Sequence, residues 1–141
     1  MKQHKENIEA MLLNNNHVFQ KYTRPAEDVK WAKSMCHKAQ LVDILPYRSK
    51  LNSPAIRLIF EFIEGKHAGE KLDYYIWLTD RAKRFAKRDL LLLGFKNLSH
   101  PNELIDHLRE TPPLCQIGVL ETRTKFPPET QREIKCFELL E

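Results

Sequence analysis

The side chains that could carry chemistry in this sequence are aromatic and basic, and they gather around the stretch KLDYYIWLTD, residues 71–80. Its alternating apolar residues predict a strand whose core face is formed by Leu72, Tyr74, Ile76 and Leu78. Tyr75 and Trp77 then lie on the outer face. Exposed rings can stack on the bases of a single nucleic-acid strand, contributing roughly 1–3 kcal/mol per base, while Lys and Arg bind its phosphates.

Cations and further rings are expected on the same surface. Arg57 lies on the matching outer face of the preceding strand, AIRLIFEFIEG, residues 55–65. The segments on either side supply the remaining candidates for nucleic-acid binding: Tyr47, Arg48 and Lys50 in one loop, and Arg123, Lys125 and Phe126, with Arg132 opposite, around the other. Each loop pairs an aromatic residue with cations, so we expect one binding surface that runs from loop to loop across the aromatic strand.

The same residues also permit a protein contact. Ile59 and Ile63 give the outer face apolar character, so Tyr75 and Trp77 would equally suit packing under the N-terminal segment or a neighbouring subunit. Phe126 precedes two prolines and would suit a turn anchor. The basic block RAKRFAKR, residues 81–88, is expected to be a solvated helix face, because its arginines lie opposite the apolar stripe of Ala82, Phe85, Ala86, Leu90 and Leu93.

Catalytic and metal-binding patterns are weak. The sequence has no phosphate loop, nucleophile elbow or HExxH, and the acids around residues 61–73 are expected to be solvated. Three cysteines at wide spacings fit neither a disulfide framework nor paired zinc knuckles. We therefore expect a binding protein that has no enzymatic activity, metal or cofactor.

Length and charge set the broad class. The chain has 141 residues, is 42% hydrophobic and carries a net charge of +4, which suits one domain and a polyanionic partner. No apolar run approaches the ~18 residues of a membrane span, and the N-terminus lacks the apolar block of a signal peptide. A cytoplasmic protein is expected.

The elements that would position these residues follow in a simple order. Strands are predicted over 31–45, 55–65, 71–80, 114–126 and 132–140, and helices over 81–93 and 101–109. The first strand has imperfect alternation, which indicates a bulge, and Pro46 is expected to end it. Glycines at both ends of EGKHAGE predict a hairpin between the second and third strands.

This order predicts a mainly β, α+β class of fold. Five strands with a helical connection between the third and fourth are typical of the OB-fold, a partly open Greek-key barrel. Its binding surface lies across strands two and three, between the loops that join strands one to two and four to five. Residues 29–141 would form this domain.

Residues 60–95 also resemble a known family. Their pattern is an apolar strand, a turn with Gly65 and Gly69, an aromatic strand, and a helix that ends in Leu90-Leu91 and Gly94-Phe95. It resembles the small phage-type and conjugative-plasmid-type single-stranded DNA-binding proteins of Gram-positive bacteria. The resemblance implies an OB-fold and sequence-tolerant coating of single-stranded DNA during replication or conjugative transfer, with weaker binding of double-stranded DNA or of RNA left open.

Residues 1–28 are polar and are expected to form a flexible N-terminal arm. Ile8, Met11 and Leu12 recur at helical spacing and would give the arm one small apolar face. Docking of this face on a neighbouring protomer would produce self-association along DNA. The alternative is a disordered tail that contributes only charge.

Overall fold

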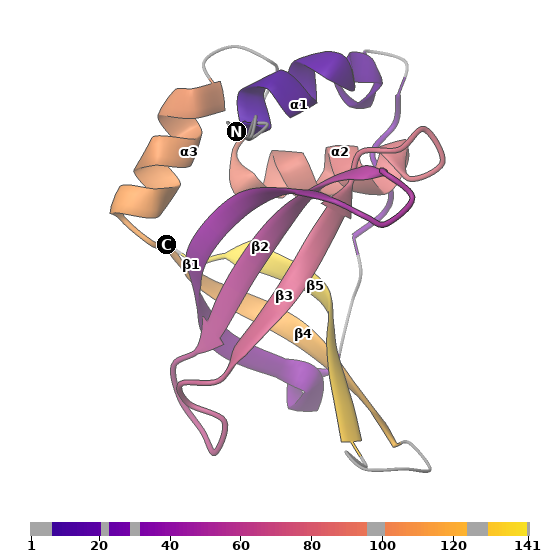
Figure 1. Cartoon of the computed structure of the whole chain (residues 1–141). Coiled ribbons are helices and arrows are strands. Elements are labelled where there is room, and N and C mark those ends of the chain that lie inside the picture. Colours follow the sequence, from indigo (N-terminus) through magenta and orange to yellow (C-terminus); the bar gives the residue numbers. More distant parts are fainter. Residues whose placement is uncertain (1–6, 21–22, 29–31, 96–100, 124–129, 141) are drawn as a thin grey trace.

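The computed structural model describes residues 7–20, 23–28, 32–95, 101–123 and 130–140. In this part of the chain the fold is α+β, with a five-stranded antiparallel sheet and three α-helices (Figure 1). The elements in chain order are α1 (Ile8–Asn14), η1 (Asn16–Phe19), η2 (Lys33–Met35), β1 (Cys36–Arg48), β2 (Pro54–Phe62), β3 (Lys71–Trp77), α2 (Lys83–Leu93), α3 (Pro101–Glu110), β4 (Leu114–Arg123) and β5 (Thr130–Leu139).

The strands are ordered β3-β2-β1-β4-β5, so the long strand β1 lies at the centre of the sheet. Residues 36–40 of β1 pair with β4, and residues 39–48 pair with β2. The register shifts between Leu41 and Asp43, within the strand for which the sequence pattern predicted a bulge. An irregularity there bends the strand, and Figure 1 shows β1 curving over the sheet.

The hydrogen-bonded sheet does not close on itself, because β3 pairs with β2 alone and β5 with β4 alone among the described strands. The two edge strands nevertheless approach each other. The rings of Tyr74 on β3 and Phe137 on β5 lie 5.4 Å apart between centroids, and Arg132 on β5 reaches Glu70 beside the start of β3 at 2.8 Å.

The inner face of the sheet matches the predicted alternation. Ile56, Leu58, Phe60 and Phe62 of β2 are buried, as is Ile76 of β3. Gly65 and Gly69 in the β2–β3 turn have φ of 80° and 92°, a conformation that favours glycine. Strands β2 and β3 pair antiparallel across this turn, which confirms the predicted hairpin.

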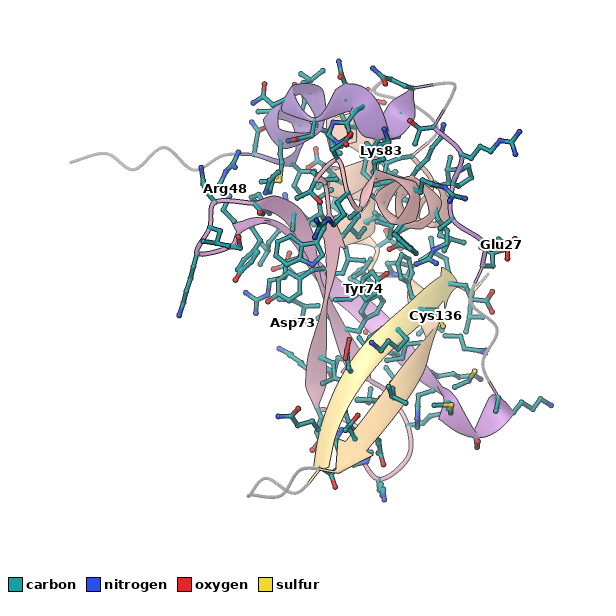
Figure 2. The ribbon with its side chains drawn as sticks, turned by 90° about the vertical axis from the view of Figure 1, so that its right-hand side faces the viewer. Glu27, Arg48, Asp73, Tyr74, Lys83 and Cys136 are labelled. Atoms are coloured by element: carbon teal, nitrogen blue, oxygen red, sulfur yellow. The ribbon has the colours of Figure 1, made fainter. Side chains whose placement is uncertain are left out.

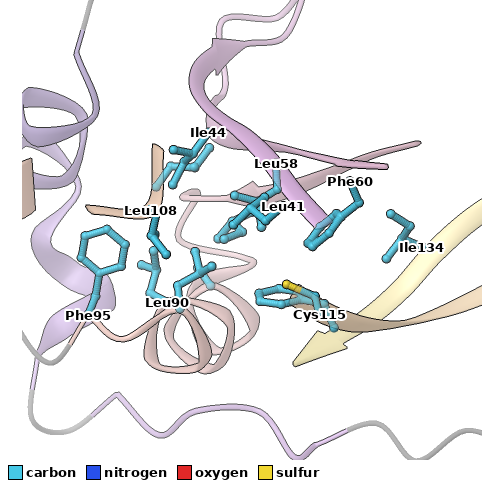
Figure 3. Packing of buried hydrophobic residues seen from close by; sticks show 14 of the residues in the cluster. Leu41, Ile44, Leu58, Phe60, Leu90, Phe95, Leu108, Cys115 and Ile134 are labelled. Atoms are coloured by element: carbon cyan, nitrogen blue, oxygen red, sulfur yellow. The ribbon is translucent and has the colours of Figure 1, made fainter. Parts of the chain in front are cut away.

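Helices α2 and α3 complete the core (Figure 1). Gly94, with φ of 108°, ends α2, and its N–H donates to the carbonyls of Leu90 and Leu91. Figure 3 shows how side chains from the sheet and from both helices meet in one cluster, which includes Leu41, Ile44, Leu58, Phe60, Leu90, Phe95, Leu108, Cys115 and Ile134. None of the helices in the described ranges has the length and apolar character that crossing a membrane requires.

The prediction of a free N-terminal arm is wrong for the described residues 7–20. Asn7 caps α1 by accepting a hydrogen bond from the N–H of Ala10, and the predicted apolar face of Ile8, Met11 and Leu12 is buried in the chain's own core. These side chains therefore have no surface to offer a neighbouring protomer. The spacing correctly predicted a helix with an apolar face but did not show what covers it.

The basic residues of α2 hold the segment after α1 in place. Three of them donate hydrogen bonds to its backbone carbonyls: Lys87 Nζ to Gln20 (2.9 Å) and Thr23 (2.7 Å), Arg84 Nε to Arg24 (3.1 Å), and Arg88 Nη1 to Glu27 (3.1 Å). These three side chains were expected to be solvated, but they satisfy backbone carbonyl acceptors of the preceding segment instead. Arg88 departs furthest from the prediction, with only 8% of its surface exposed.

Candidate nucleic-acid interface

Three aromatic rings form one cluster on the outer face of the sheet. The ring of Tyr75 stacks on that of Trp77 with 5.7 Å between centroids, and Tyr47 contacts both, at 4.8 Å from Tyr75 and 6.1 Å from Trp77. Tyr47, Ala55 and Trp77 are register partners across β1, β2 and β3. The small side chain of Ala55 is fully buried between the two larger residues. We call Tyr47, Tyr75 and Trp77 the ring cluster.

The outward direction predicted for Tyr75 and Trp77 is confirmed, since both remain partly exposed while Ile76 between them is buried. Tyr47 joins them for a reason that the sequence did not predict. Strand β1 continues through Pro46 to Arg48, so Tyr47 lies on the strand and not in the loop. Pro46 is tolerated because β1 has only β2 beside it at this point, since β4 pairs no further than Gln40.

Arg57 lies next to the ring cluster but is paired with an acid. It is the register partner of Tyr75, and its Nη2 and Nε lie 2.7 and 2.9 Å from Asp73 Oδ2. Tyr75 Oη also donates to this carboxylate, at 3.5 Å. Partial burial and the nearby Asp73 raise the pKa of Tyr75, so its hydroxyl stays protonated as a donor. Asp73, which was expected to be solvated, therefore neutralises Arg57, one of the cations predicted to contact phosphate.

The end of β1 and the loop that follows it carry two exposed cations shortly after Tyr47 in the chain. Arg48 and Lys50 are both exposed, and Arg48 Nη1 donates to the carbonyl of Asn52 at 2.9 Å. Asn52 has φ of 67°, and the N–H of Ser49 donates to the carbonyl of Ser53 at 3.0 Å, which closes the loop. Figure 2 shows Arg48 near one end of the strands. Both cations are thus exposed near the end of β1, and their part in the predicted surface stays a prediction.

The described contacts of Arg132, another predicted cation, lie at the β2–β3 turn. Arg132 Nη2 contacts Glu70 Oε2 at 2.8 Å, and its Nη1 lies 3.4 Å from His67 Nε2, so it links β5 to the β2–β3 turn. Arg123 is the last residue of β4 and pairs with Thr130. Lys125 and Phe126 lie outside the described residues.

Phe85 lies in a different environment from the predicted one. It was predicted to face the core, yet 56% of its surface is exposed on α2. The guanidinium carbon of Arg88 lies 5.6 Å from its ring centroid. The position of an aromatic residue within the basic block RAKRFAKR was the only sequence signal for it.

A buried polar cluster explains why Arg88 faces inward. Arg88 Nε donates to Asp89 Oδ1 at 3.0 Å, and Tyr74 Oη donates to Asp89 Oδ2. Burial raises the pKa of Asp89 and of Tyr74. Figure 2 shows Tyr74 between α2 and β5, so this cluster ties the helix to the sheet beside the ring cluster.

The described residues contain no group of three His, Cys, Asp or Glu side chains arranged to hold a metal ion. No known protein family matches the sequence, and no curated protein matches it either. The candidate site is therefore defined by the ring contacts of Tyr47, Tyr75 and Trp77 alone.

Proposed function

We propose that the protein binds and coats single-stranded DNA through the ring cluster, without regard to base sequence and without catalysis or a cofactor. The observation that carries the proposal is the mutual contact of Tyr47, Tyr75 and Trp77 on an outer sheet face. Partly exposed rings offer π-faces to any base, and each stacked base contributes roughly 1–3 kcal/mol. The exposed cations of the β1–β2 loop would contact phosphates beside them.

We also propose that the sheet is a partly open OB-fold barrel. The strand order β3-β2-β1-β4-β5, the position of α2 and α3 between β3 and β4, and the approach of β3 to β5 support this proposal. In such a barrel the outer face of β2 and β3 is the ligand surface, which is where Tyr75 and Trp77 lie. The resemblance of residues 60–95 to phage-type and plasmid-type binding proteins supports a role in replication or conjugative transfer.

A protein partner is the second candidate for the same surface. Asp73 neutralises the cation next to Tyr75, Arg57, and Leu51 at the loop tip is 92% exposed. Both features suit an apolar partner better than a phosphate backbone. A cytoplasmic location fits either partner and is part of the proposal.

The experiment compares labelled single-stranded DNA, duplex DNA and single-stranded RNA of equal length by fluorescence anisotropy at several salt concentrations. Single-stranded DNA is expected to bind most tightly, and the logarithm of affinity should fall with the logarithm of salt by about 0.7 per phosphate contact. Absence of binding to all three oligonucleotides would refute the nucleic-acid proposal and favour the protein partner. Tighter binding of RNA than of DNA would mean that the natural ligand is RNA and that the ring cluster is still the binding surface.

A further inference from the structure

A groove of about 470 Å³ runs beside the ring cluster, between β3, α2 and β5. Two members of the ring cluster, Tyr75 and Trp77, also line this groove, so the two surfaces are continuous. Tyr74 and Tyr75, which point to opposite faces of the sheet, both contribute to its wall. The groove therefore follows the edge of β3 that does not pair with β2. Its volume falls within the range of small-molecule sites.

The edge of β3 presents main-chain hydrogen-bonding groups to the groove. Leu78 N donates to Pro54 O at 3.0 Å, and Phe62 N donates to Glu70 O at 2.9 Å, so the even-numbered residues of β3 carry the ladder to β2. In an antiparallel pair the intervening residues direct their N–H and C=O groups away from the partner. The intervening residues that line the groove are Asp73, Tyr75 and Trp77.

An exposed ring stands on another wall of the groove. Phe85 of α2 lines it together with Ala82 and Ala86, whose small side chains leave the ring accessible. Aromatic groups on both β3 and α2 suit a flat, uncharged ligand that stacks.

The charges around the groove are paired. Each of its three acids contacts a cation: Asp73 contacts Arg57 (2.7 Å), Asp89 contacts Arg88 (3.0 Å) and Glu133 contacts Lys135 (2.7 Å). A phosphate entering the groove would meet these carboxylates as well as the cations. A nucleobase carries no charge, and its polar edge could use the main-chain groups of β3, so the groove favours the base over the phosphate.

We propose that this groove is a nucleobase site, in which one base of the bound strand leaves the row stacked on the ring cluster and inserts beside Phe85. This inference rests on the proposed function, because the inserted base belongs to the same single strand. The base stacks on Phe85 and its polar edge bonds to the free edge of β3, while its phosphate stays outside. Phe85 is then a fourth stacking residue on a different element.

The test substitutes Phe85→Ala and uses Leu91→Ala as the matched control, since Leu91 is an exposed apolar residue of α2 that does not line the groove. Binding of labelled oligothymidine is measured by anisotropy for wild type, both variants and Trp77→Ala. Phe85→Ala should weaken binding about 5- to 150-fold, the effect of one stacked base, while Leu91→Ala leaves it unchanged. Phe85→Trp should restore affinity, and the salt dependence should not change, because the Phe85 ring binds no phosphate.

The outcomes separate this inference from the proposed function. If Phe85→Ala binds as wild type does while Trp77→Ala is weakened, the groove holds no base and the ring cluster alone is the site. If wild type binds no oligonucleotide, the proposed function itself fails. If Phe85→Ala and Leu91→Ala weaken binding equally, the effect comes from α2 in general, and the base site is refuted.

Discussion

Removing the indole of Trp77 tests the ring cluster most directly. The side chain lies at one end of the row Tyr47-Ala55-Trp77 and stacks on Tyr75. Loss of one stacked base would weaken binding by about 1–3 kcal/mol, which is about a 5- to 150-fold rise in Kd. Trp77→Ala also removes two ring contacts worth about 0.5–1.5 kcal/mol each, so the free energy of unfolding should fall by about 1–3 kcal/mol.

The assay must separate these two effects. Ile59→Ala is a suitable control, because Ile59 is a partly buried residue on the same outer face of β2. Its register partners are Asp43 and Asp73, and Asp73 is four residues from Trp77 along β3. Truncation of Ile59 should cost about 1–3 kcal/mol of stability without removing a ring. Oligothymidine binding is measured by anisotropy and stability by urea unfolding for both variants, together with Trp77→Phe, which keeps a ring.

The reasoning predicts that only Trp77→Ala loses affinity and that Trp77→Phe retains most of it. Equal losses of affinity in Trp77→Ala and Ile59→Ala would show that binding follows stability. In that case the ring would only support the sheet, and the proposed stacking role would be refuted.

The remaining predictions concern charge, the N-terminal helix and alkaline pH. Four residues are expected to bind phosphates: Arg48, Lys50, Arg123 and Lys125. Replacing all four with glutamine should lower the salt slope of binding by about 0.7 for each phosphate that is no longer bound. An unchanged slope in anisotropy titrations would exclude these four residues as phosphate contacts. Met11→Ala should lower the free energy of unfolding, measured in urea, by about 2–5 kcal/mol, because Met11 is fully buried. Leu13→Ala, at a position that is 51% exposed, should stay within about 0.5 kcal/mol of wild type. Equal free energies of unfolding in the two variants would mean that residues 7–20 form a free arm after all. Burial raises the pKa of Cys115 from 9.0 to about 12, so the unfolded chain loses this proton first and stability should fall by up to about 1.4 kcal/mol per pH unit above pH 9. Cys115→Ala should remove that share of the slope in urea unfolding at pH 8 to 10.5, and an identical slope in both proteins would contradict the assignment.

The sequence alone determined which residues of β2 and β3 share a face. Side chains alternate along a strand whatever surrounds it, so Phe60 and Ile76 could be assigned to the core and Tyr75 and Trp77 to the outer face. The hairpin between these strands was predictable for a similarly local reason, because its turn contains Gly65 and Gly69, which have positive φ. The helix of α1 was predictable as well, with its apolar face.

Only the tertiary structure decided what each of these faces meets. Tyr47 reaches Trp77 because β1 runs on past Pro46, which depends on β4 being absent beside that residue. Arg88 is buried because a carboxylate and a carbonyl accept its hydrogen bonds, whereas Phe85 on the same helix is exposed.

The same holds for the charges and for the N-terminal helix. Arg57 is neutralised by Asp73 from the adjacent strand, and α1 is covered by elements that follow it by many residues. A periodic pattern shows that a face is apolar or charged, since period is a local property. It does not identify the partner of that face, because the partner is brought there by long-range packing.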